Sequence, residues 1–230
     1  LKEQRMKKKA VIAAVAVLAL IIAAVLGIRG CMAANADAAG YVQAQLDLTF
    51  QGETQEAQRF VDASRSDLEE IYESGIEAFV VAYLTAGSDT EVAYTSSFAS
   101  VTENIFRSVR YRVGQEERTG DGWEVTVSYQ PLDVLPRFVE KLAGVSSEIE
   151  KKAEEGVYSG TEEEISQAVN TEYLIRALEV LQSAYLEGEY GEEETYTFHL
   201  TRQGTGISME NEEITDFMER ILELDNLPDV

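Results

Sequence analysis

Cysteine, histidine and proline are nearly absent from this sequence. Its 230 residues include one cysteine, Cys31, one histidine, His199, and three prolines. One cysteine cannot form a disulfide within the chain, so the folded part must be stabilised by an apolar core. A zinc site needs three or four N, S or O ligands, and a hydrolytic triad needs a nucleophile beside an oriented base. A single histidine supplies neither set, so we expect no metal, no cofactor and no catalytic residue.

The common nucleotide-binding and hydrolase motifs are also missing. The sequence contains no Walker A, G-x-S-x-G, G-x-G-x-x-G or H-E-x-x-H pattern, and these patterns mark phosphate sites, activated serines and zinc sites. We therefore expect a protein that is not an enzyme. The alternative is a hydrolase of cell-envelope material that uses two facing carboxyl groups, one of them with a raised pKa.

Basic residues are scarce outside the N-terminal part of the chain. The sequence has 19 Lys and Arg against 42 Asp and Glu, and residues 1–31 hold six of the basic residues and one of the acidic ones. Residues 32–230 therefore carry 13 basic and 41 acidic residues, a formal charge of −28. Such a charge repels nucleic acid and anionic lipid headgroups and favours cationic partners, or it simply keeps the domain in solution. We expect no nucleic-acid partner.

One long apolar run lies near the N-terminus and follows a basic cluster. Residues 10–28 contain no charged or strongly polar side chain. About 20 helical residues cross a bilayer core about 30 Å thick, and a basic flank stays in the cytoplasm. We therefore expect residues 1–31 to form a cytoplasmic basic tail and a membrane anchor or signal segment. Residues 32–39 would be a connector, and residues 40–230 an acidic extracytoplasmic domain at the cell membrane of a bacterium.

Three fates of the apolar segment stay open. It could remain as a transmembrane helix. It could be a lipoprotein signal peptide, because Gly30 and Cys31 match the end of a lipobox, although Arg29 puts a charge where a small or apolar residue is usual. It could also be cleaved after Ala36, since Ala34 and Ala36 form an A-x-A site. Lipidation of Cys31 with a two-chain diacylglycerol would hold the protein stably on the membrane.

The spacing of apolar residues predicts an α+β domain. Seven segments have helical spacing: residues 42–50, 53–62, 68–83, 94–105, 138–149, 165–185 and 212–224. Four segments alternate as strands do: residues 109–113, 123–129, 196–200 and 207–209. Their order predicts a helix-rich domain with an antiparallel sheet of about four strands, covered on one face and wet on the other. Two capping boxes mark helix starts, one at Ser66 and Glu69 and one at Thr161 and Glu164.

Several stretches of the chain resemble a known family. Residues 111–113 (YRV), 121–127 (DGWEVTV) and 131–134 (PLDV) resemble the central segment of an uncharacterised family of Gram-positive cell-surface lipoproteins. Residues 41–52 are similar to the opening helix of that family. The resemblance extends over residues 37–140 and implies a cell-surface location and a cystatin-like or NTF2-like fold. It implies no activity, because none is assigned to the family.

Five aromatic residues at inward positions form a candidate ligand pocket. They are Tyr94, Phe98, Tyr111, Trp123 and Tyr129. They would line an apolar cavity if the sheet curves against the helices, and they would otherwise be ordinary core residues. Arg110 and Arg112, on the outward side of the same hairpin, could bind an anion or pair with neighbouring glutamates. We therefore predict a module that binds a small-molecule ligand or a protein at the cell surface.

Two glutamate runs and the lone histidine have simpler explanations than metal binding. Residues 162–164 and 192–194 offer carboxylates, but neither run has the loop spacing of a calcium site. Residues 162–164 fall in the first turn of a predicted helix, where negative charge favours the helix dipole. His199 alternates with inward neighbours, so we expect it on the surface.

Overall fold

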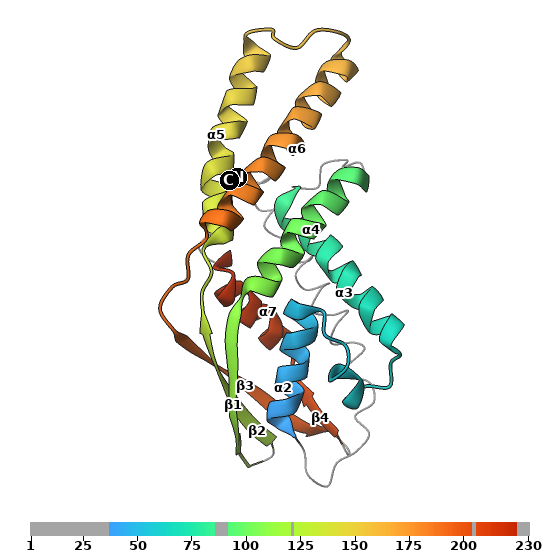
Figure 1. The fold of residues 1–230 in the computed structure, drawn as a ribbon, viewed down its shortest axis with the longest axis vertical. Helices are drawn as coiled ribbons and strands as arrows, with labels where there is room; N and C mark the ends of the chain where they lie inside the picture. The colour runs from blue at the N-terminus through green and yellow to red at the C-terminus, as the bar shows by residue number, and fades with distance from the viewer. Residues whose placement is uncertain (1–36, 86–91, 121, 204–205, 225–230) are drawn as a thin grey trace.

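The chain folds into an α+β body from which two long helices project (Figure 1). The computed structural model describes residues 37–85, 92–120, 122–203 and 206–224. The predicted membrane segment, residues 10–28, and Cys31 lie outside these residues. Within the described ranges, no helix has both the length and the apolar character that a bilayer crossing requires.

Helical segments precede the sheet, as the apolar spacing predicted. They are α2 (Ala38–Leu46) with its π-helical continuation η1 (Asp47–Gln51), the 3-10 helix η2 (Ala57–Arg59), α3 (Arg65–Phe79) with its π-helical continuation η3 (Val80–Leu84), and α4 (Val92–Ser108). The helix expected at 53–62 is wrong, because only η2 forms there. The expected cap at Ser66 is also wrong, since Ser64 and Asp67 make the capping box of α3. Glu69 pairs instead with Arg65, at 2.7 Å.

The sheet has four antiparallel strands in chain order. They are β1 (Arg110–Arg118), β2 (Gly122–Gln130), β3 (Glu194–Gln203) and β4 (Gly206–Met209). A β-bulge between Val113 and Glu116 shifts the register of β1. Val125 and Val127 are buried whereas Thr126 between them is exposed. The α+β class, both hairpins and the single covered face are therefore as predicted.

The core is centred on Phe217 of α7 (Asn211–Ile221), which is completely buried. Its ring lies 5.2–6.2 Å, centroid to centroid, from four other aromatic rings, those of Phe50, Tyr129, Tyr196 and Phe198. These rings come from η1, β2 and β3. The inner face of the sheet is thus joined to α7 and to the first helical segment by one aromatic cluster.

The two projecting helices are α5 (Val134–Glu154) and α6 (Glu162–Glu187), which we call the arm (Figure 1). They pack antiparallel and are joined by residues 155–161. Gly156 and Gly160 have φ of +71° and +135°, a conformation that only glycine adopts without strain. Both glycines therefore help the chain to turn between the two helices.

Candidate interaction site on the helical arm

Two short segments, residues 131–133 and 188–193, connect the arm to the sheet, and we call them the neck. Leu132 and Tyr190 form an antiparallel bridge. The N–H of Asp133 donates to the carbonyl of Glu189 at 3.2 Å, and the N–H of Gly191 donates to the carbonyl of Pro131 at 2.9 Å. The arm is therefore attached through two paired chain segments instead of one flexible linker.

Asp133 is the centre of the polar contacts in the neck. Its Oδ1 accepts a hydrogen bond from the N–H of Glu189 at 2.7 Å, and its Oδ2 accepts one from Arg137 Nε at 2.6 Å. Arg137 Nη2 in turn donates to Glu189 Oε2 at 2.8 Å. The hydrogen bond to Asp133 raises the pKa of Arg137 above its usual value. Both ends of the arm are thus held to each other at the point where they leave the body.

Tyr190 ties the neck to the body. Its hydroxyl donates to the carbonyl of Ser108, at the end of α4, at 2.6 Å. The guanidinium of Arg110 lies 3.6 Å from the centre of the Tyr190 ring, a cation–π contact. The N–H of Leu132 donates to the carbonyl of Ile221 at the end of α7, at 2.9 Å. Contacts to α4, β1 and α7 therefore fix the direction in which the arm points.

Polar side chains join α5 to α6 along the whole arm. Lys141 Nζ lies 2.6 Å from Glu187 Oε2, Arg176 Nη2 lies 3.1 Å from Glu148 Oε2, and Lys152 Nζ lies 2.5 Å from Glu172 Oε1. Each exposed pair of this kind contributes about 0–1 kcal/mol, so together they set the register of the helices more than their stability.

Apolar packing in the arm weakens away from the body. The half of α6 near the body buries four side chains, Leu174, Ala177, Leu181 and Ala184. From Glu162 to Tyr173, where every residue is described, no side chain of α6 is buried. On α5, Val145 and Ile149 are the buried residues of this outer part. The outer half of the arm, residues 145–172, is therefore a two-helix element with a thin core.

An open depression of about 570 Å³ lies on one face of α6. The described residues that line it are Glu164, Gln167, Ala168, Thr171, Glu172, Ile175 and Arg176. Ile175 is 44% exposed although it is a large apolar residue. The spacing of three and four places these side chains on one stripe of the helix. Glu172 and Arg176, at one edge of this stripe, pair with Lys152 and Glu148 of α5, whereas Ala168, Thr171 and Ile175 are exposed and form an uncovered face.

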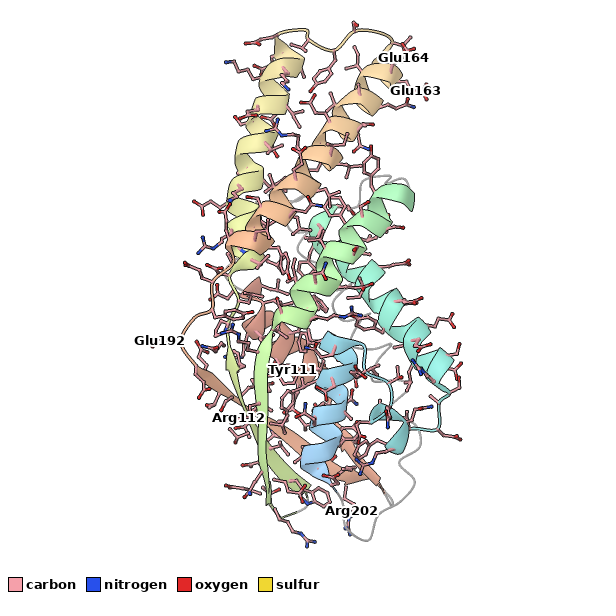
Figure 2. The ribbon with its side chains drawn as sticks, in the orientation of Figure 1. Tyr111, Arg112, Glu163, Glu164, Glu192 and Arg202 are labelled. Atoms are coloured by element: carbon pink, nitrogen blue, oxygen red, sulfur yellow. The ribbon has the colours of Figure 1, made fainter. Side chains whose placement is uncertain are left out.

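The outer half of the arm is also strongly acidic. Residues 145–172 contain eight Asp and Glu and two Lys, a formal charge of −6. The remaining arm residues, 134–144 and 173–187, contain three acidic and three basic residues and are neutral. Glu163 and Glu164 project from the outer end of α6 (Figure 2). Both lie in the first turn of α6, where Thr161 and Glu164 form the predicted capping box.

The aromatic residues of the predicted pocket belong to the main core or pack against it. Phe98, Trp123 and Tyr129 are buried, and Tyr94 and Tyr111 are partly buried against them. The Tyr111 hydroxyl donates to Asp47 Oδ1 at 2.6 Å, and burial is the main cause that raises the pKa of this tyrosine. Contact with a ligand stays a prediction for all five.

Arg110 and Arg112 lie on the outer side of β1, as alternation predicted. Arg110 stacks on Tyr190 and donates to Gln130 Oε1 at 3.4 Å. Arg112, labelled in Figure 2, lies 3.7 Å from Glu193 Oε1. Their binding of an anion stays a prediction.

Two other polar residues have roles that the sequence did not reveal. Glu116 Oε2 accepts hydrogen bonds from the N–H groups of Ala38 and Ala39 at 2.6 and 3.1 Å, so β1 caps the first turn of α2. His199 is exposed, and its Nδ1 lies 2.7 Å from Glu213 Oε1 on α7. Burial raises the pKa of Glu213. Among the described residues, no group of three or more His, Cys, Asp or Glu side chains is placed to hold a metal ion.

The depression on α6 was not predicted from the sequence, although the sequence contains a pattern that indicates it. The helical spacing of α6 was assigned from an apolar series that begins at Ile165 and ends at Tyr185. Ala168, Thr171 and Ile175 form a second stripe with the same period. Two apolar stripes on one helix are typical of a helix that packs on two sides.

Comparison with known proteins yields one structural likeness. No protein-family model and no curated protein matches the chain. Among solved structures it is similar to ycdA of Bacillus subtilis subsp. subtilis str. 168, provisionally described as a lipoprotein, with 17% sequence identity and a TM-score of 0.48. The match covers 81% of this chain and 56% of that one, so the chain spans little more than half of its length. A likeness at this level does not place the chain in a family.

Proposed function

We propose that this chain is a membrane-tethered, extracytoplasmic module that binds a protein partner through its arm. Tethering is supported by the apolar run at residues 10–28 behind five basic residues, followed by Cys31. An extracytoplasmic position follows from the same charge asymmetry. The acidic domain would then face outward from a membrane whose anionic headgroups repel it.

The observation that carries the binding proposal is the contrast between the two ends of the arm. The neck holds the arm in one direction through Asp133 and Tyr190. The outer half has a thin core and an uncovered stripe on α6. A docking element needs an incompletely packed, charged surface that is held rigidly. A preorganised site loses less conformational entropy on binding than a flexible one does.

The hydrolase alternative receives no support from the carboxylates around the depression. Glu164 and Glu172 are eight residues apart on one helix, about 12 Å along its axis, and a glycosidase needs two carboxyl groups facing each other. Hydrogen bonds from Thr161 lower the pKa of Glu164, and the hydrogen bond from Lys152 lowers the pKa of Glu172. A general acid needs the opposite shift. Burial raises the pKa of Glu213 and of Glu223, but neither lines the depression.

Site-specific photocrosslinking in membranes of the native host tests the binding proposal. The full-length chain would carry p-benzoylphenylalanine at Thr171 on the arm, or at Val81, a half-exposed residue of η3 in the body. We expect a discrete protein adduct from position 171 and none from position 81. Adducts from position 81 alone, or from neither position, would contradict binding through the arm.

The tether is tested separately by the intact mass of protein purified from those membranes. We expect either a full-length mass or the mass of a chain that begins at Cys31 and carries a diacylglycerol. A chain that begins after Ala36 and is recovered from the soluble fraction would contradict tethering, whatever the crosslinking shows.

A further inference from the structure

The depression lies along one face of α6, and we call it the groove. Its lining residues recur every three or four positions from Glu164 to Arg176. Twelve residues of helix extend about 18 Å, which is the length of about three turns of a partner. Ala168 and Thr171, near the middle, are small, and small side chains let two helix axes approach to about 8–10 Å.

Nearer the body, α6 has a second helical neighbour. There α4 packs against α6, and Figure 1 shows the outer half of the arm extending beyond α4. The part of α6 near the body has both α4 and α5 as neighbours and buries Leu174, Ala177, Leu181 and Ala184. The outer part of α6 has α5 beside it and buries no side chain before Leu174. A third helix in the groove would give the outer part of α6 a second helical neighbour too.

The charge of the outer half of the arm determines which kind of partner helix is complementary to the groove. The outer half of the arm carries a formal charge of −6. Arg176, the one basic residue in the described lining, is already paired with Glu148 at 3.1 Å and lies 3.8 Å from Glu179. Two arms would repel each other, which disfavours a second copy of this chain, and an anionic bilayer is disfavoured for the same reason. A helix with basic residues on its polar face is complementary.

We infer that the groove on α6 receives a cationic amphipathic helix of the partner protein, an inference that rests on the proposed function. The apolar face of the partner packs on Ala168, Thr171 and Ile175. Its lysine or arginine side chains lie beside the glutamates of the outer half, Glu163 and Glu164 among them. The outer arm and the partner then form a three-helix bundle, a helix-in-groove mode of recognition.

A defined peptide tests this inference. The probe is a 14-residue, fluorescently labelled peptide of leucine and lysine, with the leucines on one helical face and both termini blocked. The full-length chain is held in phosphatidylcholine nanodiscs, and empty nanodiscs supply the blank. We expect saturable binding by fluorescence anisotropy, and no binding of a peptide in which every lysine is replaced by glutamate.

A charge-matched pair of variants locates the binding. Thr171→Lys/Ile175→Lys puts two lysines in the groove, four residues apart. Gln182→Lys/Leu186→Lys makes the same change at two exposed positions of α6 outside it. Circular dichroism checks that both variants are folded. We expect the groove variant to weaken binding at least tenfold and the control variant to weaken it less than twofold.

Each other outcome overturns the inference in a recognisable way. If both variants weaken peptide binding equally, the peptide is attracted by the net charge and does not occupy the groove. If binding is not saturable, a cationic helix is excluded as the occupant of the groove. Self-association that only the groove variant abolishes, seen by sedimentation, would identify a second copy as the occupant. Crosslinking from position 171 to a host protein would still stand in these cases, so the proposed function can survive when the helix inference fails.

Discussion

Lys152 of α5 and Glu172 of α6 form the outermost ion pair between the two helices of the arm, with Nζ 2.5 Å from Oε1. The hydroxyl of Tyr158, from the connecting loop, donates to the other carboxylate oxygen, Oε2, at 2.9 Å. Glu172 also lines the depression on α6. One carboxylate therefore joins both helices and their loop while it shapes the surface to which we assign binding.

Replacing Glu172 with Gln should loosen the outer half of the arm without unfolding the protein. The change removes the charge that pairs with Lys152, and exposed pairs contribute only about 0–1 kcal/mol. We expect faster amide hydrogen exchange in residues 145–172 and little change in the free energy of unfolding. Glu179→Gln, which removes an exposed carboxylate 3.8 Å from Arg176, is the control. Equal exchange in both variants would contradict the role of Glu172.

The Glu172 contribution should disappear in acid. The hydrogen bond from Lys152 lowers the pKa of Glu172 below its ordinary value of 4.5. When folding lowers the pKa of a carboxyl group, that group stabilises the folded state at pH values above its ordinary pKa. This stabilisation is lost as the pH falls through the lowered pKa. We therefore expect the thermal midpoint of wild type to exceed that of Glu172→Gln at pH 7, and the two to converge as the pH falls through the lowered pKa. A difference that persists undiminished in acid would exclude an electrostatic origin.

Asp133→Asn should widen the range of directions in which the arm points. The substitution weakens the contact with Arg137 Nε and leaves the helices of the arm unchanged. Spin labels at Val157, in the loop of the arm, and at Val81, in the body, would report the distance distribution by pulsed electron resonance in a Cys31→Ser background. We expect a narrow distribution for the unaltered neck and a broader one for Asp133→Asn.

Asp216→Asn, an exposed carboxylate of α7, is the control for the neck. It should leave the distance distribution narrow. A distribution already broad in the protein with Asp133 would mean that the neck does not fix the arm.

Phe217→Ala should cost about 3–5 kcal/mol in free energy of unfolding, measured with urea. The Phe217 ring is fully buried and touches aromatic rings from η1, β2 and β3, so its loss leaves a cavity at the centre of the body. Val81→Ala, at a position that is 50% exposed, should change the free energy by less than about 0.5 kcal/mol. A loss below about 1 kcal/mol for Phe217→Ala would place the centre of the core elsewhere.

The fold was largely predictable because its strands alternate cleanly. Val125, Thr126 and Val127 differ so strongly in polarity that only one register buries the apolar side. Helix starts were less certain, since Ser64 and Ser66 are both followed three residues later by an acidic residue. A local pattern cannot choose between two such caps, and in the structure the earlier one is used.

The candidate site was not predictable, because it depends on contacts between distant parts of the chain. The Tyr190 hydroxyl reaches the carbonyl of Ser108, 82 residues away, and the Asp133 carboxylate reaches the N–H of Glu189, 56 residues away. These contacts direct α5 and α6 away from the body and leave one stripe of α6 uncovered. Periodicity identified the inward aromatic residues, but it cannot tell a filled core from a cavity.

Hydrogen exchange measured on the full-length chain distinguishes binding through the arm from binding elsewhere on the protein. Exchange would be compared between native membranes, where the partner is present, and the purified chain in phosphatidylcholine nanodiscs. We predict slower exchange in membranes at residues 164–176 of α6, with α3 and the sheet unchanged. Slower exchange confined to the outer face of the sheet, around Arg110 and Arg112, or no difference anywhere, would contradict binding through the arm.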